Sequence, residues 1–265
     1  MKEKTLKSWE DFEQASLRII SEKREQKEKT EVHVDHPLFR GQSDSGWRLE
    51  SALDRIQKEM SVDHYNTIVK IVHKHVATCT GRGWDLDTKV SLGEFNLPAY
   101  EFMAYLRHNE FPSPLLDWSR SPYIAAYFAF SDIYLTSKDI KYVSIFVCPE
   151  HFWYGKEPHI RSLGPTIATH RNHYLQQSEY TICIKKKGKE IYYDDYEAVK
   201  NKEEQDVMIK YNIPVSEQSK VLRKLDSMNI TAYSLFDSES SLMETLAMRD
   251  ICFEKWDRLS AYKNE

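Results

Sequence analysis

An arginine and a glycine stand together near residue 40, at the end of a short apolar run. Arg40 follows Leu38 and Phe39, and Gly41 comes next. A guanidinium presents paired N–H groups that suit phosphate or carboxylate, and a glycine lets the backbone approach a ligand closely because it has no Cβ. These residue types predict an anion-binding position. The structural alternative is an arginine that pairs with a nearby acidic side chain.

Two serines precede a run of small and aromatic residues. Ser119 and Ser121 stand just before a predicted buried helix over residues 121–135. Hydroxyl groups at a helix N-terminus either cap the helix, which is the commoner case, or hold an anion. Asp117, just before them, could orient the arginine described above, and Trp118 could stack on a flat ring or fill space in the core.

A third polar cluster lies directly against an apolar run that predicts a strand. It consists of Gln177, Ser178 and Glu179, and the strand is expected from residue 180 onward. Side chains two residues apart in an extended chain point to the same side, so Gln177 and Glu179 are expected to face one site. A fixed carboxylate there could stabilise developing positive charge on a substrate. The alternative is a solvated charge at the edge of a sheet.

Hydrophobic periodicity predicts the elements that must bring these stretches together. Helical patterns occupy residues 8–20, 63–79, 98–107, 121–135, 216–228 and 240–253. Strand patterns occupy residues 141–149, 180–193 as two strands around Gly188, 207–214 and 230–236. The order lacks successive strand–helix units, which predicts an α+β fold rather than a doubly wound sheet.

Length and composition bound the architecture. The chain has 265 residues, of which 41% are apolar and 12% aromatic, and these values are typical of a globular protein. We expect residues 1–34 to form a helical, charged N-terminal extension and residues 35–265 to form a single globular domain. The net charge of -4 conceals no strongly basic half, so bulk charge does not identify the partner.

Several common classes of site have no signature in this chain. The four cysteines are far apart and predict core thiols rather than a zinc ribbon or a disulfide framework. Two histidine pairs, His33 with His36 and His73 with His75, lack a third ligand at a recognisable spacing, so no metal site is expected. Neither a signal peptide nor a run of about 18 apolar residues is found, which predicts a cytoplasmic protein that does not span a membrane.

Taken together, the polar stretches resemble the FRG-domain family, which is named for the residues that stand here as Phe39, Arg40 and Gly41. The segments "FRGQSDSGWRLESALDR" and "RHNEFPSPLLDWSRSPYIAAYFA" are similar to that family's opening and central motifs, and "RNHYLQQSEYT" is similar to a later one. Arg107 and Glu110 depart from the central motif. The resemblance runs from about residue 35 to the end of the chain.

The order of the motifs also resembles that of ADP-ribosyltransferases of the arginine, serine-x-serine, glutamate type. Those enzymes place an arginine on the first core strand, an STS-like motif before a helix, and an E/Q-x-E motif at a later strand. The resemblance implies an ADP-ribosyltransferase-like fold with a mixed, mainly antiparallel β core and surrounding helices. It also implies NAD as the ADP-ribose donor and no metal ion.

This resemblance implies roles for the candidate residues in binding NAD. Arg40 would hold the diphosphate, and the backbone at Gly41 would approach the carboxamide. Ser119 would support the NAD site and Ser121 would cap the helix, while Trp118 offers a stacking face.

The resemblance also implies which residues carry the chemistry. Glu179 would stabilise the oxocarbenium-like transition state that forms when nicotinamide leaves the ribose. Gln177 would face the acceptor, and because an amide suits a neutral group, a base of RNA or DNA is favoured over an arginine. Glu239 and Glu244 are the next carboxylates to examine for the role of Glu179.

Two function classes stay open. The first is an NAD-dependent ADP-ribosyltransferase that acts as a toxin or phage-defence effector, with nucleic acid as acceptor and an antitoxin protein as partner. The second is a non-catalytic FRG module that binds nucleic acid, a nucleotide or a partner protein through the same arginine-lined cleft. A carboxylate beside a bound anion would weaken binding, so Glu179 separates the two classes.

Overall fold

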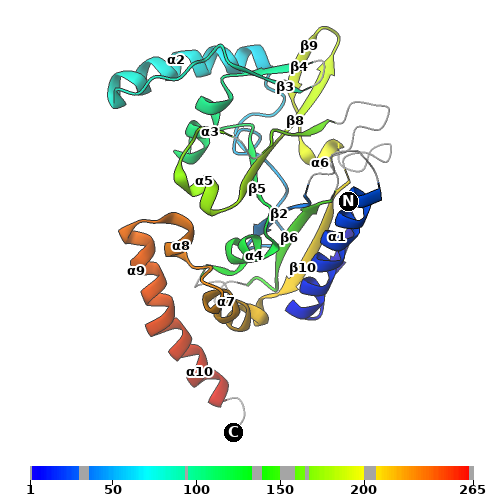
Figure 1. The fold of residues 1–265 in the computed structure, drawn as a ribbon, viewed down its shortest axis with the longest axis vertical. Helices are drawn as coiled ribbons and strands as arrows, with labels where there is room; N and C mark the ends of the chain where they lie inside the picture. The colour runs from blue at the N-terminus through cyan, green and yellow to red at the C-terminus, as the bar shows by residue number, and fades with distance from the viewer. Residues whose placement is uncertain are drawn as a thin grey trace.

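A computed structural model describes residues 2–29, 36–92, 95–132, 139–149, 159–164, 167–199 and 207–262. The described chain combines a central, mainly antiparallel sheet with surrounding helices (Figure 1). The expectation of a mixed fold built on a mainly antiparallel β core is therefore confirmed.

Eight strands form the central sheet, in the order β1-β10-β6-β2-β5-β8-β7, with β9 pairing with β8 beyond this path. Every pairing in it is antiparallel except that of β1 with β10. The strands are β1 (Lys2–Thr5), β2 (Leu38–Gln42), β5 (Leu116–Ser119), β6 (Tyr142–Cys148), β7 (Ile160–Ser162), β8 (Ser178–Lys187), β9 (Glu190–Tyr193) and β10 (Ile209–Pro214). A separate antiparallel pair consists of β3 (Lys89–Leu92) and β4 (Phe95–Pro98).

The pairing between the central strands β2 and β5 is short. The register between β2 and β5 contains a single pair, Phe39 with Ser119. On either side the pairing is longer, since β2 pairs with β6 over five residues and β5 pairs with β8 over four. The two halves of the sheet therefore diverge after Phe39 on β2 and before Ser119 on β5, and Arg40 and Trp118 have no ladder pairing with each other.

The helices of the described chain cover both sides of this sheet. They are α1 (Trp9–Lys29), α2 (Val62–Thr80), α3 (Tyr100–His108), α4 (Pro122–Phe130), α5 (Arg171–Leu175), α6 (Tyr196–Val199), α7 (Gln218–Ser227), α8 (Ala232–Phe236), α9 (Glu239–Ala247) and α10 (Phe253–Tyr262). A 3₁₀ turn (Val215–Glu217) precedes α7, and a π-helical turn (Met248–Cys252) joins α9 to α10. In Figure 1 α9 and α10 extend away from the body, and α2 lies at the opposite end.

Helix α4 packs directly against β2 and fixes the position of the Arg40–Gly41 motif. It is buried on nearly every side because its sequence is almost entirely small and aromatic. A Cβ at Gly41 would stand 1.9 Å from the carbonyl oxygen of Ala125 and 2.7 Å from the amide nitrogen of Ala129. Only a glycine permits the strand and the helix to approach this closely.

The N-terminal segment is part of the same core and not a separate extension. Strand β1 pairs with β10, and the side chains of Trp9 and Phe12 on α1 are buried together with Tyr211 of β10. The boundary expected at residue 34 lies outside the described residues.

Most predicted elements are present, with two corrections. Residues 230–236, expected as a strand, contain helix α8, because Thr231 and Ser234 form a reciprocal capping box that starts a helix. Pro98 ends strand β4 instead of opening α3, which begins two residues later after Ala99 in a left-handed conformation. The two strands around Gly188 are present as β8 and β9.

Within the described parts of the chain, no helix combines the length and the apolar character that crossing a membrane requires.

Candidate functional site

A cavity of about 460 Å³ opens where β2 and β5 diverge. Three arginines contribute to its wall, together with aromatic rings and amide or hydroxyl side chains. The arginines are Arg40, Arg55 and Arg107, and the principal rings are Trp47, Trp118, Phe128, Tyr180 and Phe236. Its volume lies in the range of small-molecule and cofactor sites.

Arg40 joins the two diverging strands. Its Nη1 donates to the backbone carbonyl of Asp117 at 2.6 Å and to Oδ2 of the same residue at 3.0 Å. The Nε of Arg40 is buried and has no hydrogen-bond partner among the described residues. Both expected uses of this arginine are thus compatible with the structure: one side of the guanidinium pairs with an acid, and the other keeps a donor for a ligand.

Asp117 is held between two guanidinium groups. Its Oδ1 accepts from Nε of Arg107 at 2.7 Å, while Oδ2 accepts from Arg40. Burial alone would raise the pKa of this carboxyl group, but Arg40 and Arg107 outweigh that effect and hold the pKa well below its ordinary value. The Asp117 side chain is therefore an anion at neutral pH, and it fixes the orientation of both arginines.

The two serines have different positions. Ser119 lines the cavity, and its Oγ donates to the backbone carbonyl of Gln176 at 2.8 Å. Ser121 caps α4 by accepting from the amide of Ile124 at 3.3 Å. The described wall of the cavity includes Trp118 but not Ser121.

Glu179 does not face this cavity. It lies within β8 opposite Trp118 of β5 and is only 2% exposed, so it is not a solvated edge charge. Its Oε2 accepts from Nε and Nη2 of Arg120 at 3.0 and 2.9 Å, and its Oε1 accepts from the Ser162 hydroxyl. Arg40 and Ser119 therefore line one cavity, and Glu179 does not.

Gln177 is not on the strand. Its φ of 48° is left-handed, its carbonyl accepts from the amide of Arg120 at 3.0 Å, and β8 begins at the next residue. The expectation that Gln177 and Glu179 share one side of an extended chain is therefore wrong, because alternation applies only inside a strand. Gln177 is absent from the described wall of the cavity.

The residues of β8 that do line the cavity are the neighbours of Glu179. Ser178 and Tyr180 pair in register with Ser119 and Asp117, and all four contribute to the wall. The strand period of two places these side chains on the face opposite to that of Glu179. Counting the strand alternation from Ser178, where β8 begins, predicts that Ser178 and Tyr180 share one face.

Several further wall residues were not among the site residues expected from the sequence. His108 at the end of α3 makes a 2.8 Å hydrogen bond through Nε2 with the hydroxyl of Tyr180, and burial lowers its pKa. Arg107 departs from the family pattern yet orients Asp117. These residues converge through packing of α3 against the sheet and are separated from Tyr180 by about 70 positions in the sequence.

Two amide side chains on the wall have a buried acceptor atom without a hydrogen-bond partner among the described residues. Gln42, which is 5% exposed, donates through Nε2 to the carbonyl of Arg48 at 3.2 Å, but its Oε1 has no partner among the described residues. Oδ1 of Asn172 is likewise buried and without a partner in the described chain. A ligand with hydrogen-bond donors would satisfy both atoms.

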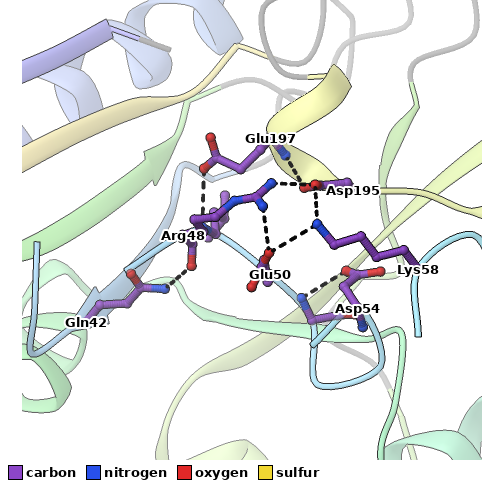
Figure 2. Close-up of polar contacts among 9 residues, drawn as sticks. Gln42, Arg48, Glu50, Asp54, Lys58, Asp195 and Glu197 are labelled. Atoms are coloured by element: carbon purple, nitrogen blue, oxygen red, sulfur yellow. Dashed lines mark hydrogen bonds and ion pairs between the residues drawn. The ribbon is translucent and has the colours of Figure 1, made fainter. Parts of the chain in front are cut away.

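The loop between β2 and α2 carries the outermost wall residues and is fixed by a polar network, which Figure 2 shows. Arg48 pairs with Asp195 at 2.5 Å and with Glu50 at 3.3 Å, and Lys58 lies 3.6 Å from Asp195. The backbone amide of Leu49 donates to Glu197 at 3.3 Å. The loop is thereby tied to the residues that begin α6.

The other candidate carboxylates lie away from the cavity wall. Glu244 accepts from the hydroxyl of Tyr127 at 3.2 Å, and Glu239 begins helix α9. Among the described side chains, no group of three or more histidine, cysteine, aspartate or glutamate residues is arranged to hold a metal ion.

Comparison with known families gives one match. No curated protein and no solved structure matches the chain. The one family match spans residues 35–137. It covers the strand of Arg40, the helix of Arg107 and His108, and the segment from Asp117 to Ser121, and it ends before Gln177 and Glu179. Residues 35–137 match the family described as FRG domain, in agreement with the resemblance of Phe39, Arg40 and Gly41 to that family's defining residues.

Proposed function

We propose that the arginine-lined cavity binds NAD and that the protein transfers ADP-ribose from it. The observation that carries this proposal is the convergence of Arg40, Trp118 and Ser119 on one cavity, from two strands that are distant in sequence. These three residues are candidates implied by the resemblance to ADP-ribosyltransferases, and they have the chemistry that a dinucleotide needs.

The charge of the wall favours a diphosphate. Arg40, Arg55 and Arg107 oppose two carboxylates on the same wall, Asp117 and Glu110. The excess of guanidinium groups, and the free Nε of Arg40 in particular, supply donors for phosphate oxygens.

The remaining wall suits the other parts of a dinucleotide. The rings of Phe128 and Phe236, which are only partly buried, offer apolar surface for a base or for nicotinamide, whereas Trp118 and Tyr180 are almost fully buried in the wall. The unpaired acceptor atoms of Gln42 and Asn172 suit ribose hydroxyl or amide N–H groups.

The arrangement of strands supports an ADP-ribosyltransferase-like fold as part of the proposal. The three motifs lie on β2, at the end of β5 and at the start of β8, and these strands are consecutive neighbours in the sheet. The serine motif is followed directly by helix α4. This is the order that the resemblance implies.

Glu179 can act on bound NAD only after it leaves Arg120 and the start of β8 rearranges, because its side chain lies on the face of the strand opposite to that of Ser178 and Tyr180. Breaking a buried ion pair costs on the order of 3–5 kcal/mol when one partner stays uncompensated. In the proposal, the pair opens after NAD has bound, in the step that leads to the transition state, and the released carboxylate then stabilises the oxocarbenium-like transition state. The proposed role of Gln177 toward the acceptor depends on the same rearrangement, since Gln177 contacts the backbone of Arg120.

The second candidate function is a non-catalytic FRG module that binds a nucleotide. The observation that favours it is the pairing of Glu179 with Arg120 and Ser162, which keeps the carboxylate away from the cavity. An anion in the cavity then meets no opposing charge from this residue. A role as a toxin or phage-defence effector with an antitoxin partner rests on the resemblance alone.

Calorimetric titration with NAD tests the binding step. We expect saturable binding to the wild-type protein and at least a tenfold loss of affinity in Arg40→Ala, with Arg82→Ala, an exposed arginine outside the cavity, as the matched control. Release of nicotinamide then separates the two functions, because a binding module holds NAD without cleaving it. Failure of the wild-type protein to bind NAD at millimolar concentration would refute the proposal.

A further inference from the structure

A largely exposed tryptophan, Trp47, lies at the mouth of the cavity. Trp47 is 53% exposed although it contributes to the cavity wall. Full burial of a side chain of this size would stabilise the fold by roughly 2–3 kcal/mol or more. A single exposed ring is not in itself unusual, so its surroundings decide whether it is a site.

The backbone on both sides of Trp47 is anchored. Ser45, on one side, donates through its amide to the carbonyl of Tyr142 at 2.9 Å and accepts from Nζ of Lys210 at 2.6 Å. Arg48, on the other side, forms the ion pair with Asp195 that is drawn in Figure 2. The exposed ring is therefore held by a rigid loop, so ordering it for a partner costs little conformational entropy.

Arg55 stands on the same loop and the same cavity wall with a free guanidinium. It is exposed, and none of the described residues forms a hydrogen bond or ion pair with it. The residues before it are fixed, because the amide of Leu53 donates to the carbonyl of Ser113 at 3.1 Å and Asp54 accepts from Ser51 at 2.7 Å. Arg40 and Arg107 share Asp117, whereas Arg55 has no acidic partner among the described residues, so its guanidinium can bind an additional anion.

We propose that Trp47 and Arg55 form a binding surface for single-stranded nucleic acid, with a base stacked on Trp47 and a phosphate bound by Arg55. A fixed aromatic face beside a free cation is the combination that binds single strands without reading their sequence. Bases inside a duplex are stacked on one another and do not present a face to Trp47. The surface lies at the entrance to the cavity, so an acceptor base held there adjoins the proposed NAD site; this acceptor role rests on the proposed function, whereas the binding itself does not.

The lysine-rich end of β8 is the competing basic feature. Lys185 and Lys187 lie 3.7 and 2.8 Å from the carboxylate of Glu59, so part of their charge is already neutralised. They are also about 20 Å or more along the strand from Ser178 at the cavity, given a rise of about 3.3 Å per residue. The cavity mouth is therefore the better placed of the two surfaces for an acceptor.

Fluorescence-anisotropy titration with labelled 12-nucleotide single-stranded RNA, single-stranded DNA and duplex DNA tests the proposal. We expect both single strands to bind more tightly than the duplex. Trp47→Ala should weaken single-strand binding roughly 5- to 150-fold, the range for loss of one stacked base, and Trp47→Phe should restore most of the affinity. Tyr174→Ala is the matched control, because Tyr174 is 85% exposed and outside the described cavity wall.

The salt dependence isolates the role of Arg55. Loss of one phosphate contact should reduce the slope of log affinity against log salt concentration by about 0.7 for a single strand. Arg55→Ala should show this change, and Arg82→Ala should not. Equal binding of single strands by wild type, Trp47→Ala and Arg55→Ala would overturn the proposal. Tighter binding of the duplex than of single strands would also overturn it, and so would binding of an acidic protein in place of nucleic acid.

The single-strand binding surface and the proposed function can be tested independently of each other. NAD titration of Trp47→Ala should give an affinity within about twofold of wild type if Trp47 contacts only the acceptor strand. Arg55→Ala is not used in this comparison, because Arg55 also contributes to the positive charge of the cavity wall. Single-strand binding without NAD binding would refute the proposed function and leave this inference standing. NAD cleavage by the wild-type protein, together with unchanged single-strand affinity in Trp47→Ala and Arg55→Ala, would refute this inference and leave the proposed function standing.

Discussion

The carboxylate of Glu179 is held by the guanidinium of Arg120, whose Nε and Nη2 both donate to Oε2 at 3.0 and 2.9 Å. Glu179 is almost fully buried, whereas Arg120 keeps about 29% of its side chain exposed. The pair separates the carboxylate that the sequence marks for catalysis from the cavity that it would have to serve.

Glu179→Gln tests whether this pair opens in the reaction. The substitution removes the charge and keeps the size, so we expect unfolding to become easier by roughly 3 kcal/mol, with NAD affinity changed less than twofold because the carboxylate lies outside the cavity. If the released carboxylate stabilises the transition state, nicotinamide release falls about a hundredfold or more. Urea denaturation, NAD titration and nicotinamide release separate the three effects. A normal rate of release would restrict Glu179 to a structural role.

Gly41 is predicted to be indispensable for packing. A Cβ there would overlap the backbone of α4, so Gly41→Ala must separate β2 from α4 and should cost about 1–3 kcal/mol or more of unfolding free energy. Gly83→Ala is the matched control, since nothing lies within 4 Å of a Cβ at that position, and it should change stability by less than about 0.5 kcal/mol. Thermal and urea unfolding of both variants measure the difference; equal stability of the two would contradict the packing argument.

The fold was predictable wherever local pattern and tertiary packing agree. The hairpin around Gly188 and the helix after Ser121 follow from alternation, turn chemistry and capping. Residues 230–236 were expected to form a strand because their branched and aromatic residues favour one. The capping box of Thr231 and Ser234 instead starts a helix.

The site was predictable in its types of residue more than in its geometry. Arg40 and Ser119 lie on the cavity wall as their chemistry suggested. The face that Glu179 occupies depends on the register of β8 against β5, and a shift of one residue would have exchanged the faces of the strand. Partners such as Arg107 for Asp117 arise from long-range packing that no local pattern encodes.

Asp117 should make the unfolding free energy depend on pH in the acidic range. Its folded pKa lies below the unfolded value of about 3.9, so the stabilisation is fully present above that pH and is lost as pH falls toward the folded pKa. Asp117→Asn leaves Arg40 and Arg107 facing each other and should cost roughly 1–3 kcal/mol at pH 7, less than a fully buried pair because the side chain is 38% exposed. Urea midpoints at pH 7, 5, 4 and 3 should show the gap between wild type and variant narrowing below about pH 4. A gap that stays constant across this range would contradict the assignment.

The network of Figure 2 should control the loop more than global stability. Asp195→Asn weakens the contacts of Arg48 and Lys58, which are largely exposed, so the unfolding free energy should change by less than about 1 kcal/mol. Amide hydrogen exchange at residues 44–50 should become faster, because local opening needs less free energy. Single-strand binding should weaken by about two- to tenfold through the added cost of ordering Trp47. Unchanged exchange in this segment would show that other contacts fix the loop.

The most direct measurement of the central claim is transfer of label from NAD carrying labelled ADP-ribose, with separate pools of RNA, DNA and protein as acceptors. The account predicts label in a nucleic-acid pool, release of nicotinamide in equal amount, and loss of both in Arg40→Ala while Arg82→Ala behaves as wild type. No label in any pool together with no release of nicotinamide from NAD that is demonstrably bound would contradict the transferase and leave the binding module.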